Sequence, residues 1–203
     1  QALDRFRSDF EESLVRGWAG FTGRLIEKAA PRPTGVPTSY VMKPFEVRLD
    51  YLGRPWCSVK FELGHNEIGD ADRPDHQLAP DLAVLFTEVG LESPRPVPVM
   101  RADHQVAQKL HAASETGSER ARDLVDLQLL DRGEELDLAQ VASTCRRLFE
   151  YRRQQEWPPT IVSGNQWDTL YTQAADGLDV LAGLDEAIAW ANEFIRRIDS
   201  ARA

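Results

Sequence analysis

The sequence lacks several features that would assign a protein to a class directly. It contains no apolar run approaching the ~18 residues that a membrane-spanning helix needs, and its first residues show no cationic segment followed by an apolar one. It has only two cysteines, Cys57 and Cys145, and their separation matches no metal-binding spacing. We therefore expect a cytoplasmic protein with no membrane segment, in which both cysteines are reduced, buried thiols.

Common catalytic and nucleotide-binding motifs are also missing. The chain has no G-x-S-x-G turn, no G-x-x-x-x-G-K loop and no G-x-G-x-x-G fingerprint, so no motif supports a hydrolase or a dinucleotide-binding protein. His104 and His111 are separated by two helical turns, which is too far for one zinc ion held at i and i+4. His65 and His76 fall in a polar loop without cysteine partners. A zinc site is disfavoured, and a metal hydrolase using His104 and His111 is a distant alternative.

The charge of the chain is acidic. It has 33 acidic residues against 24 lysines and arginines, a net charge of −9, which argues against indiscriminate binding to nucleic acid. Three arginine pairs lie in segments with a helical pattern: Arg146–Arg147, Arg152–Arg153 and Arg196–Arg197. They are either parts of solvated helix faces or an electrostatic footprint for RNA. The sequence leaves both interpretations open.

The first segment has the periodicity of a helix. Apolar residues recur there at three- and four-residue steps, at Leu3, Phe6, Phe10 and Leu14. This pattern predicts a helix over residues 3–28, with a possible break near Gly17 and Gly20. The segment Pro31–Tyr40 follows as a proline-rich connection.

Alternating residues then indicate a β-hairpin. Strands are predicted over Tyr40–Tyr51 and Trp56–Leu63, joined by a turn at Leu52–Pro55. The polar stretch Gly64–Pro80 is predicted to be loop. Residues 82–89 fit either a short helix or a strand.

The second half of the sequence is helical in pattern. Helices are expected at about 102–115, 118–132, 137–154, 165–176 and 184–201. The proline-rich stretch Pro94–Val99 precedes them, and we place the domain boundary there. A first half that contains a sheet and a second half built of helices predict the α+β class.

One lysine and two aspartates form the main candidate site. Lys109 lies beside an apolar helical stripe, so its stem can pack while its ammonium reaches a cleft. Asp123 and Asp126 are three residues apart on the next helix, and their like charges require a nearby cation. Lys109, Arg120, Arg122 or a bound cation could supply it. The set is either a site for a phosphate and its metal ion or a salt bridge beside a helical core.

Glu62 is a further candidate, on the polar face of the second predicted strand and near its end. Carboxylates in such places often hold Mg²⁺, which prefers oxygen ligands. Glu67 and Asp70 in the following loop could assist it. A solvent-facing strand glutamate is the simpler interpretation.

The order and context of these pieces resemble a known family. QVAQKLHAAS, a short polar turn and RARDLVDLQLL, together with VKFELGHNE and the WPP segment at Trp157–Pro159, resemble the AbiEii family of nucleotidyltransferase toxins. The likeness looks closest to the mycobacterial MenT-type members. The resemblance implies a nucleotidyltransferase-like sheet portion over residues 1–100, followed by a helical C-terminal domain over residues 101–203.

The same resemblance implies a function. Members use a nucleoside triphosphate (NTP) with Mg²⁺, and MenT-type toxins transfer nucleotides to the 3′ end of tRNA, which blocks translation until a cognate antitoxin neutralises them. By resemblance Lys109 contacts the triphosphate, Asp123 is the later motif aspartate with Asp126 beside it, and Glu62 occupies the acidic, metal-binding strand position. The alternative is a non-catalytic helical module that binds a protein partner such as an antitoxin.

One element of the family pattern is not found. The first motif is a Gly-Ser turn followed by an Asp-x-Asp pair on a strand, which binds the metal ions. Asp4 and Asp9 lie in a helical pattern at the wrong spacing. We therefore expect that the sequence starts just downstream of that strand and that this polypeptide is inactive alone.

Overall fold

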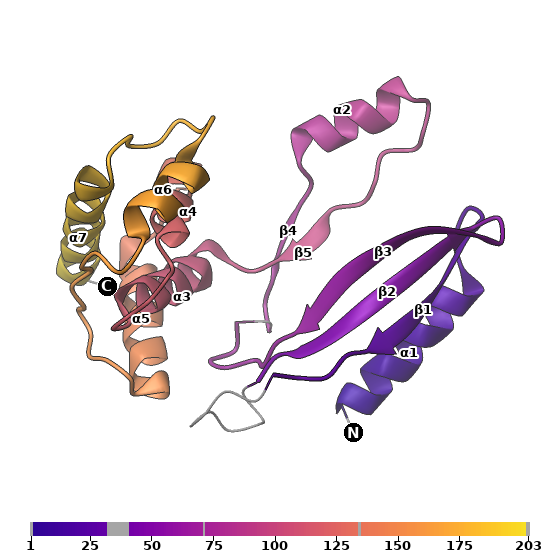
Figure 1. Cartoon of the computed structure of the whole chain (residues 1–203), viewed down its shortest axis with the longest axis horizontal. Coiled ribbons are helices and arrows are strands. Elements are labelled where there is room, and N and C mark those ends of the chain that lie inside the picture. Colours follow the sequence, from indigo (N-terminus) through magenta and orange to yellow (C-terminus); the bar gives the residue numbers. More distant parts are fainter. Residues whose placement is uncertain (1, 32–40, 71, 134, 202–203) are drawn as a thin grey trace. The chain divides into compact units, whose positions relative to one another are not determined.

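The structure consists of two compact units, each described by itself. A computed structural model describes residues 2–31, 41–70, 72–133 and 135–201. The first unit ends at Asn66 and the second begins at Glu67. The first contains one helix and a three-stranded sheet, whereas the second contains helices and a two-stranded sheet (Figure 1). This mixture agrees with the predicted α+β class.

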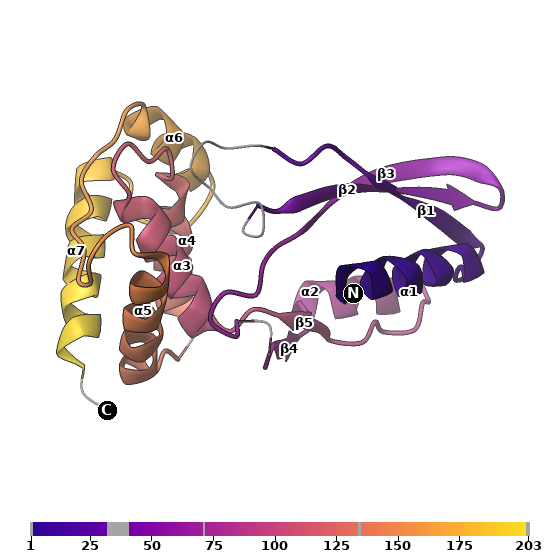
Figure 2. The same ribbon diagram turned by 90° about the horizontal axis from the view of Figure 1, so that it is seen from below.

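In the first unit, helix α1 (Ala2–Arg16) covers one face of an antiparallel sheet, as Figure 2 shows. The sheet has the order β1 (Phe21–Glu27), β2 (Lys43–Tyr51) and β3 (Arg54–Leu63). The apolar stripe of the helix makes this contact, because the rings of Phe6 and Phe10 lie 5.9 and 5.7 Å from the ring of Phe61.

The predicted hairpin is confirmed. Strands β2 and β3 are joined by Leu52 and Gly53, whose φ angles of 48° and 77° are both positive. Two successive positive φ angles are the mark of the type I′ turn, which matches the twist of antiparallel strands. The proline-rich connection predicted at Pro31–Tyr40 falls almost entirely on residues 32–40, which lie outside the described part of the chain.

The prediction of a helix over residues 3–28 was wrong in its second half. Helix α1 ends at Arg16, and Gly17 follows with a φ of +72°. A Cβ atom at Gly17 would lie 2.2 Å from the carbonyl oxygen of Phe21, so the chain can turn back only at a glycine. Strand β1 was missed because Gly23 occupies an inward position in it, which interrupts the apolar alternation.

In the second unit, short elements precede the helices. Strand β4 (Asp75–Gln77) lies in the predicted loop, and it pairs with β5 (Val97–Val99) in the predicted proline-rich bridge. Both strands are too short to give a periodic signal. Residues 82–89, which fit either a helix or a strand by sequence, lie almost entirely in helix α2 (Pro80–Glu88).

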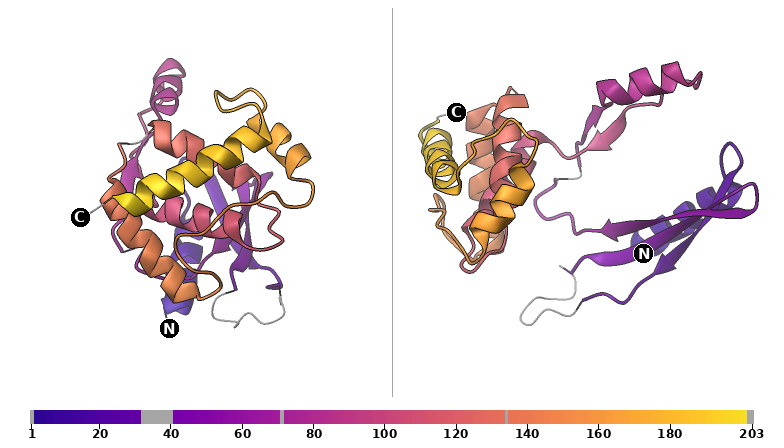
Figure 3. Two further views of the ribbon diagram at one scale, coloured as in Figure 1. Left: turned by 90° about the vertical axis from the view of Figure 1, so that its left-hand side faces the viewer. Right: turned by 45° about the horizontal axis from the view of Figure 1, so that its top comes forward.

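Five helices then pack together, and Figure 3 shows α7 crossing the others. They are α3 (Ala102–Ser114), α4 (Arg122–Gly133), α5 (Leu138–Arg152), α6 (Trp167–Ala175) and α7 (Leu184–Ser200). All five lie where the sequence predicts them. Their core is closed by side chains with no solvent exposure, among them Val106, Leu110, Leu124, Leu127, Leu148 and Phe194.

The division between the units differs from the boundary predicted at residue 100. Three side chains of the helices hold the segment that begins at Glu67. Glu67 pairs with Arg152 at 2.7 Å, the Ile68 carbonyl accepts a 2.7 Å hydrogen bond from Arg147, and Asp70 accepts one of 2.9 Å from Gln108. Residues after Glu67 therefore belong with the helices. That residues 1–100 form a nucleotidyltransferase portion stays a prediction.

The expectations drawn from composition have mixed outcomes. Cys145 is buried as predicted, and burial raises the pKa of its thiol. Cys57 is exposed on β3, so the prediction of a buried thiol was wrong there, because that face of β3 is covered only near Phe61. Among the described helices, none has both the length and the apolar character needed to cross a bilayer.

Candidate functional site

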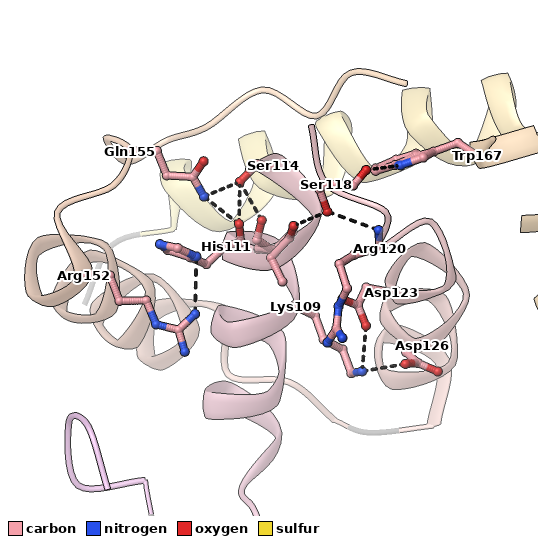
Figure 4. A network of polar contacts seen from close by, with 12 residues as sticks. Lys109, His111, Ser114, Ser118, Arg120, Asp123, Asp126, Arg152, Gln155 and Trp167 are labelled. Atoms are coloured by element: carbon pink, nitrogen blue, oxygen red, sulfur yellow. Dashed lines mark hydrogen bonds and ion pairs between the residues drawn. The ribbon is translucent and has the colours of Figure 1, made fainter. Parts of the chain in front are cut away.

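Lys109 and both predicted aspartates meet between α3 and α4 (Figure 4). The Lys109 ammonium lies 3.3 Å from Asp123 Oδ1 and 2.5 Å from Asp126 Oδ2. Arg120, just before α4, donates to the other oxygen of Asp123 at 2.9 Å. The repulsion expected between two carboxylates on one helix is thus offset by two cations, and Arg122, the third predicted candidate, is exposed and outside this set.

The two carboxylates differ in their access to solvent. The Asp123 side chain is 1% exposed, whereas that of Asp126 is 43% exposed and that of Lys109 is 22% exposed. Asp123 also lies in the first turn of α4, where the helix dipole favours a negative charge. Asp123 is therefore a fixed anchor for two cations, while Asp126 is an accessible carboxylate that shares one of them.

Two surface hollows adjoin the Lys109 side chain. One has a volume of about 670 Å³ and the other of about 400 Å³, both within the ~300–1,000 Å³ range of small-molecule sites. Lys109 and Gln105, one turn apart on α3, line both of them. They are the two residues that the hollows share, and we call them the ridge.

The larger hollow is cationic. Its charged lining residues are Lys109, Arg120 and Arg152, and its lining includes no carboxylate. Gln77, Gln105 and Gln108 add amide groups to its walls. Such a lining suits an anion with several oxygen atoms, such as a polyphosphate.

Arg152 is positioned in this hollow by groups behind it. Its guanidinium makes a two-point contact with Glu67, at 2.7 Å from Oε2 and 3.2 Å from Oε1, and its Nη1 lies 3.3 Å from Nδ1 of His111. His111 is 1% exposed. Burial, followed by the neighbouring Arg152 charge, lowers the pKa of His111 to about 4, so the imidazole is neutral at pH 7 and can accept from the guanidinium.

A match to a protein-family model identifies the family of this chain. The model described as "Nucleotidyl transferase AbiEii toxin, Type IV TA system" matches residues 2–194, which span both units and the whole Lys109 cluster. The chain belongs to the AbiEii family. No curated protein matches it.

Membership makes the chain a nucleotidyltransferase toxin of a type IV toxin–antitoxin system, with an antitoxin as its implied partner. In this AbiEii protein the predicted residues Lys109, Asp123 and Asp126 come together. Glu62 is an exposed residue of β3 in the first unit, and its role as a metal ligand stays a prediction. Glu67 and Asp70, predicted as helpers of Glu62, are instead bound to Arg152 and Gln108.

The carboxylates around Lys109 in the AbiEii site are already paired with cations, which does not suit a metal ion. Both oxygens of Asp123 face cations, and a third positive charge beside them would be unfavourable. The described residues contain no group of three or more His, Cys, Asp or Glu side chains able to hold a metal. His104 and His111 are buried in α3.

Sequence patterns missed the environment of Arg152. The sequence suggested either a solvated face or an RNA footprint for its arginine pair, and neither describes a guanidinium at the wall of a hollow. Four other paired arginines are bound to partners within the second unit: Arg146 to Asp199, Arg147 to Ile68, Arg196 to Glu193 and Arg197 to Asp131. The Arg152–Arg153 pair was the only sign of this site in the sequence. The partner of Arg152, Glu67, is too distant in the chain to be recognised from a local pattern.

Proposed function

We propose that this AbiEii protein transfers a nucleotide from an NTP to the 3′ end of a tRNA, with Mg²⁺, and thereby blocks translation. The resemblance to MenT-type toxins supports the choice of tRNA. The observation that carries the proposal is the Lys109 ammonium at the edge of a hollow lined by three cations and no carboxylate. In a protein with a net charge of −9, such a lining is a specific feature.

The charges that line this hollow support a triphosphate as its occupant. Arg120 and Arg152 carry guanidinium N–H groups in addition to those bound to Asp123 and Glu67, whereas a lysine supplies a compact charge that can change partners. Lys109 is the only lysine in residues 67–203, where all other strong cations are arginines. We assign to it the contact with the triphosphate oxygens nearest the reacting phosphorus.

The proposed reaction is an in-line displacement. The 3′-hydroxyl oxygen of the acceptor forms a bond to the α-phosphorus, the bond to the bridging oxygen breaks, and pyrophosphate leaves with the electron pair. Lys109 and Arg120 offset the charge on the phosphate oxygens. Asp123 binds both cations, and Asp126 contacts Lys109 from the smaller hollow.

Mg²⁺ remains part of this proposal even though Asp123 and Asp126 are paired with cations. When bound, the ion would neutralise phosphate charge. We propose Glu62 as a ligand, because an exposed carboxylate is the type of group that Mg²⁺ prefers.

One observation favours the non-catalytic alternative. A carboxylate that is 1% exposed between two cations is also how a purely structural ion pair looks. In that case the helical unit would bind a protein partner, and the Lys109 cluster would only hold α3 to α4.

A label-transfer assay tests the proposal. The protein, expressed from its complete gene, is mixed with total tRNA, Mg²⁺ and each labelled NTP in turn. We expect label on intact tRNA and none on tRNA whose terminal ribose has been oxidised with periodate. Lys109→Ala should abolish transfer, Lys109→Arg should retain part of it, and the adjacent control Arg122→Ala should match the unmodified protein.

The opposite results would reject the proposal. No label with any NTP from a folded protein would leave the binding module as the better explanation. Equal label on oxidised tRNA would show that the 3′ end is not the acceptor.

A further inference from the structure

The two hollows beside Lys109 differ in chemistry, although the same ridge bounds them. The larger one combines three cations with three glutamines. The smaller one is lined, beyond the ridge residues, by Asp126, Leu129, Leu130 and Gly133 of α4. A substrate that spans the ridge would therefore meet a cationic surface on one side and a mixed acidic and apolar surface on the other.

The smaller hollow is unsuited to a triphosphate. Its own carboxylate, Asp126, would repel phosphate oxygens, and its leucines offer them no hydrogen bonds. The same groups suit a nucleoside. A base can pack on apolar side chains, and a carboxylate accepts hydrogen bonds from ribose hydroxyl groups. Leu129 is 39% exposed, so it is available for such packing.

We propose that the hollow formed by Asp126, Leu129, Leu130 and Gly133 receives the terminal nucleoside of the RNA acceptor, and that Asp126 contacts its attacking hydroxyl. This inference rests on the proposed function, and it adds the place of the acceptor. The donor triphosphate occupies the cationic hollow, so the hydroxyl and the α-phosphorus meet over Lys109.

The ion pairs allow Asp126 to be released when the donor binds. Lys109 now contacts both aspartates, and a triphosphate in the cationic hollow competes for its ammonium. Asp123 can lose part of that contact because Arg120 still holds its other oxygen. Asp126 has Lys109 as its one ion-pair partner among the described residues, and its exposure leaves it free to turn to a hydroxyl group.

The chemical step then balances as follows. The hydroxyl oxygen bonds to the α-phosphorus, and the proton of the hydroxyl passes to the Asp126 carboxylate. The bond from phosphorus to the bridging oxygen breaks, and pyrophosphate carries away its electron pair. Asp126 returns the proton to water before the next turnover.

Steady-state kinetics with a defined acceptor test this placement. The acceptor is a synthetic RNA hairpin with a single-stranded 3′ end, and the donor is the NTP found in the transfer assay. Leu129→Glu should raise the KM for RNA about tenfold, which corresponds to about 1.4 kcal/mol, and change the KM for NTP less than about twofold. Val162→Glu is the matched control, because Val162 is 70% exposed and lines neither hollow.

Two more variants distinguish the binding of RNA in the hollow from the proton transfer to Asp126. Gly133→Leu should act like Leu129→Glu, since a Cβ atom at Gly133 meets nothing within 4 Å and the new side chain can enter without strain. Asp126→Asn should lower kcat at saturating RNA and NTP, because it keeps the shape but removes the proton acceptor. Thermal unfolding of each variant confirms that it is folded.

The outcomes distinguish this inference from the function on which it rests. If the unmodified protein transfers label while both hollow variants keep its KM for RNA, the acceptor lies elsewhere and only the inference fails. The same holds if the variants raise the KM for NTP instead. If the folded, unmodified protein transfers no label, the proposed function itself is rejected.

Discussion

Replacing Lys109 with methionine should destabilise the helical unit mainly through Asp123, although Asp126 is the nearer carboxylate. The ammonium lies 3.3 Å from Asp123 and 2.5 Å from Asp126, but their exposures are 1% and 43%. A hydrogen bond to a charged group contributes about 1.5–3 kcal/mol when desolvated, whereas an exposed ion pair contributes about 0–1 kcal/mol. We expect Lys109→Met to lower the free energy of unfolding by about 2–3 kcal/mol.

Double-mutant cycles measure the two contributions separately. Combining Lys109→Met with Asp123→Asn should be less destabilising than the sum of the single changes by about 1–2 kcal/mol, because the buried carboxylate that would keep only Arg120 as a cation partner is then neutral as well. Combining Lys109→Met with Asp126→Asn should show a coupling below about 0.5 kcal/mol, since water replaces the lost contact. Burial rather than distance thus sets the ranking.

Urea unfolding followed by tryptophan fluorescence is a suitable assay. The reporter background carries Trp18→Phe and Trp56→Phe, because these exposed residues belong to the first unit and would mix its unfolding into the signal. Slopes against urea must agree among variants for the free energies to be compared. A larger coupling with Asp126 than with Asp123 would refute the reasoning and make Asp126 the anchor of the lysine.

Three further predictions concern other parts of the molecule. The pKa of His111 is about 4 in the folded state, below the ~6.5 of an unfolded histidine. The free energy of unfolding should therefore fall by up to about 3 kcal/mol as the pH drops from ~6.5 to ~4. Urea unfolding of His111→Gln over the same pH range should lack this loss. Tyr171→Phe should lower the midpoint of urea unfolding, equivalent to about 1–3 kcal/mol, because the hydroxyl joins Gln128 to a backbone carbonyl in the core; an unchanged midpoint would contradict this. Gly23→Ala should destabilise the first unit by about 1–3 kcal/mol, since the new methyl group would lie 2.9 Å from a methyl carbon of Leu49, and circular dichroism of a thermal melt would detect it.

The helices of the second unit could be predicted because their cores are built from one periodic pattern. Leu124 and Leu127 are fully buried as their spacing indicates, and Leu130 packs against the same core. Strand β1 could not be predicted in this way, because Leu25 and Ile26 are adjacent apolar residues that also fit a helix. Short strands such as β4 and β5 are fixed by pairing across a long stretch of chain, which a local pattern does not contain.

The candidate site was partly predictable for the same reason. Lys109 and the two aspartates lie on adjacent helices joined by a short turn, so periodicity alone brings them near each other. The sequence could not show which aspartate is buried, because that depends on the packing of every neighbouring helix. Nor could it join Arg152 to Glu67, which lie 85 residues apart in the chain.

The bonds formed by the segment after Asn66 have a practical consequence for isolating the helical unit. A fragment that begins at residue 101, where the composition changes, would lack Glu67 and the Ile68 carbonyl. The guanidinium of Arg152 would then sit beside neutral His111 without its carboxylate, and Arg147 would lose its bond to the backbone. A fragment that begins at Glu67 keeps these bonds, so limited proteolysis of the folded chain should leave the sequence from Glu67 to Asp70 attached to the helices.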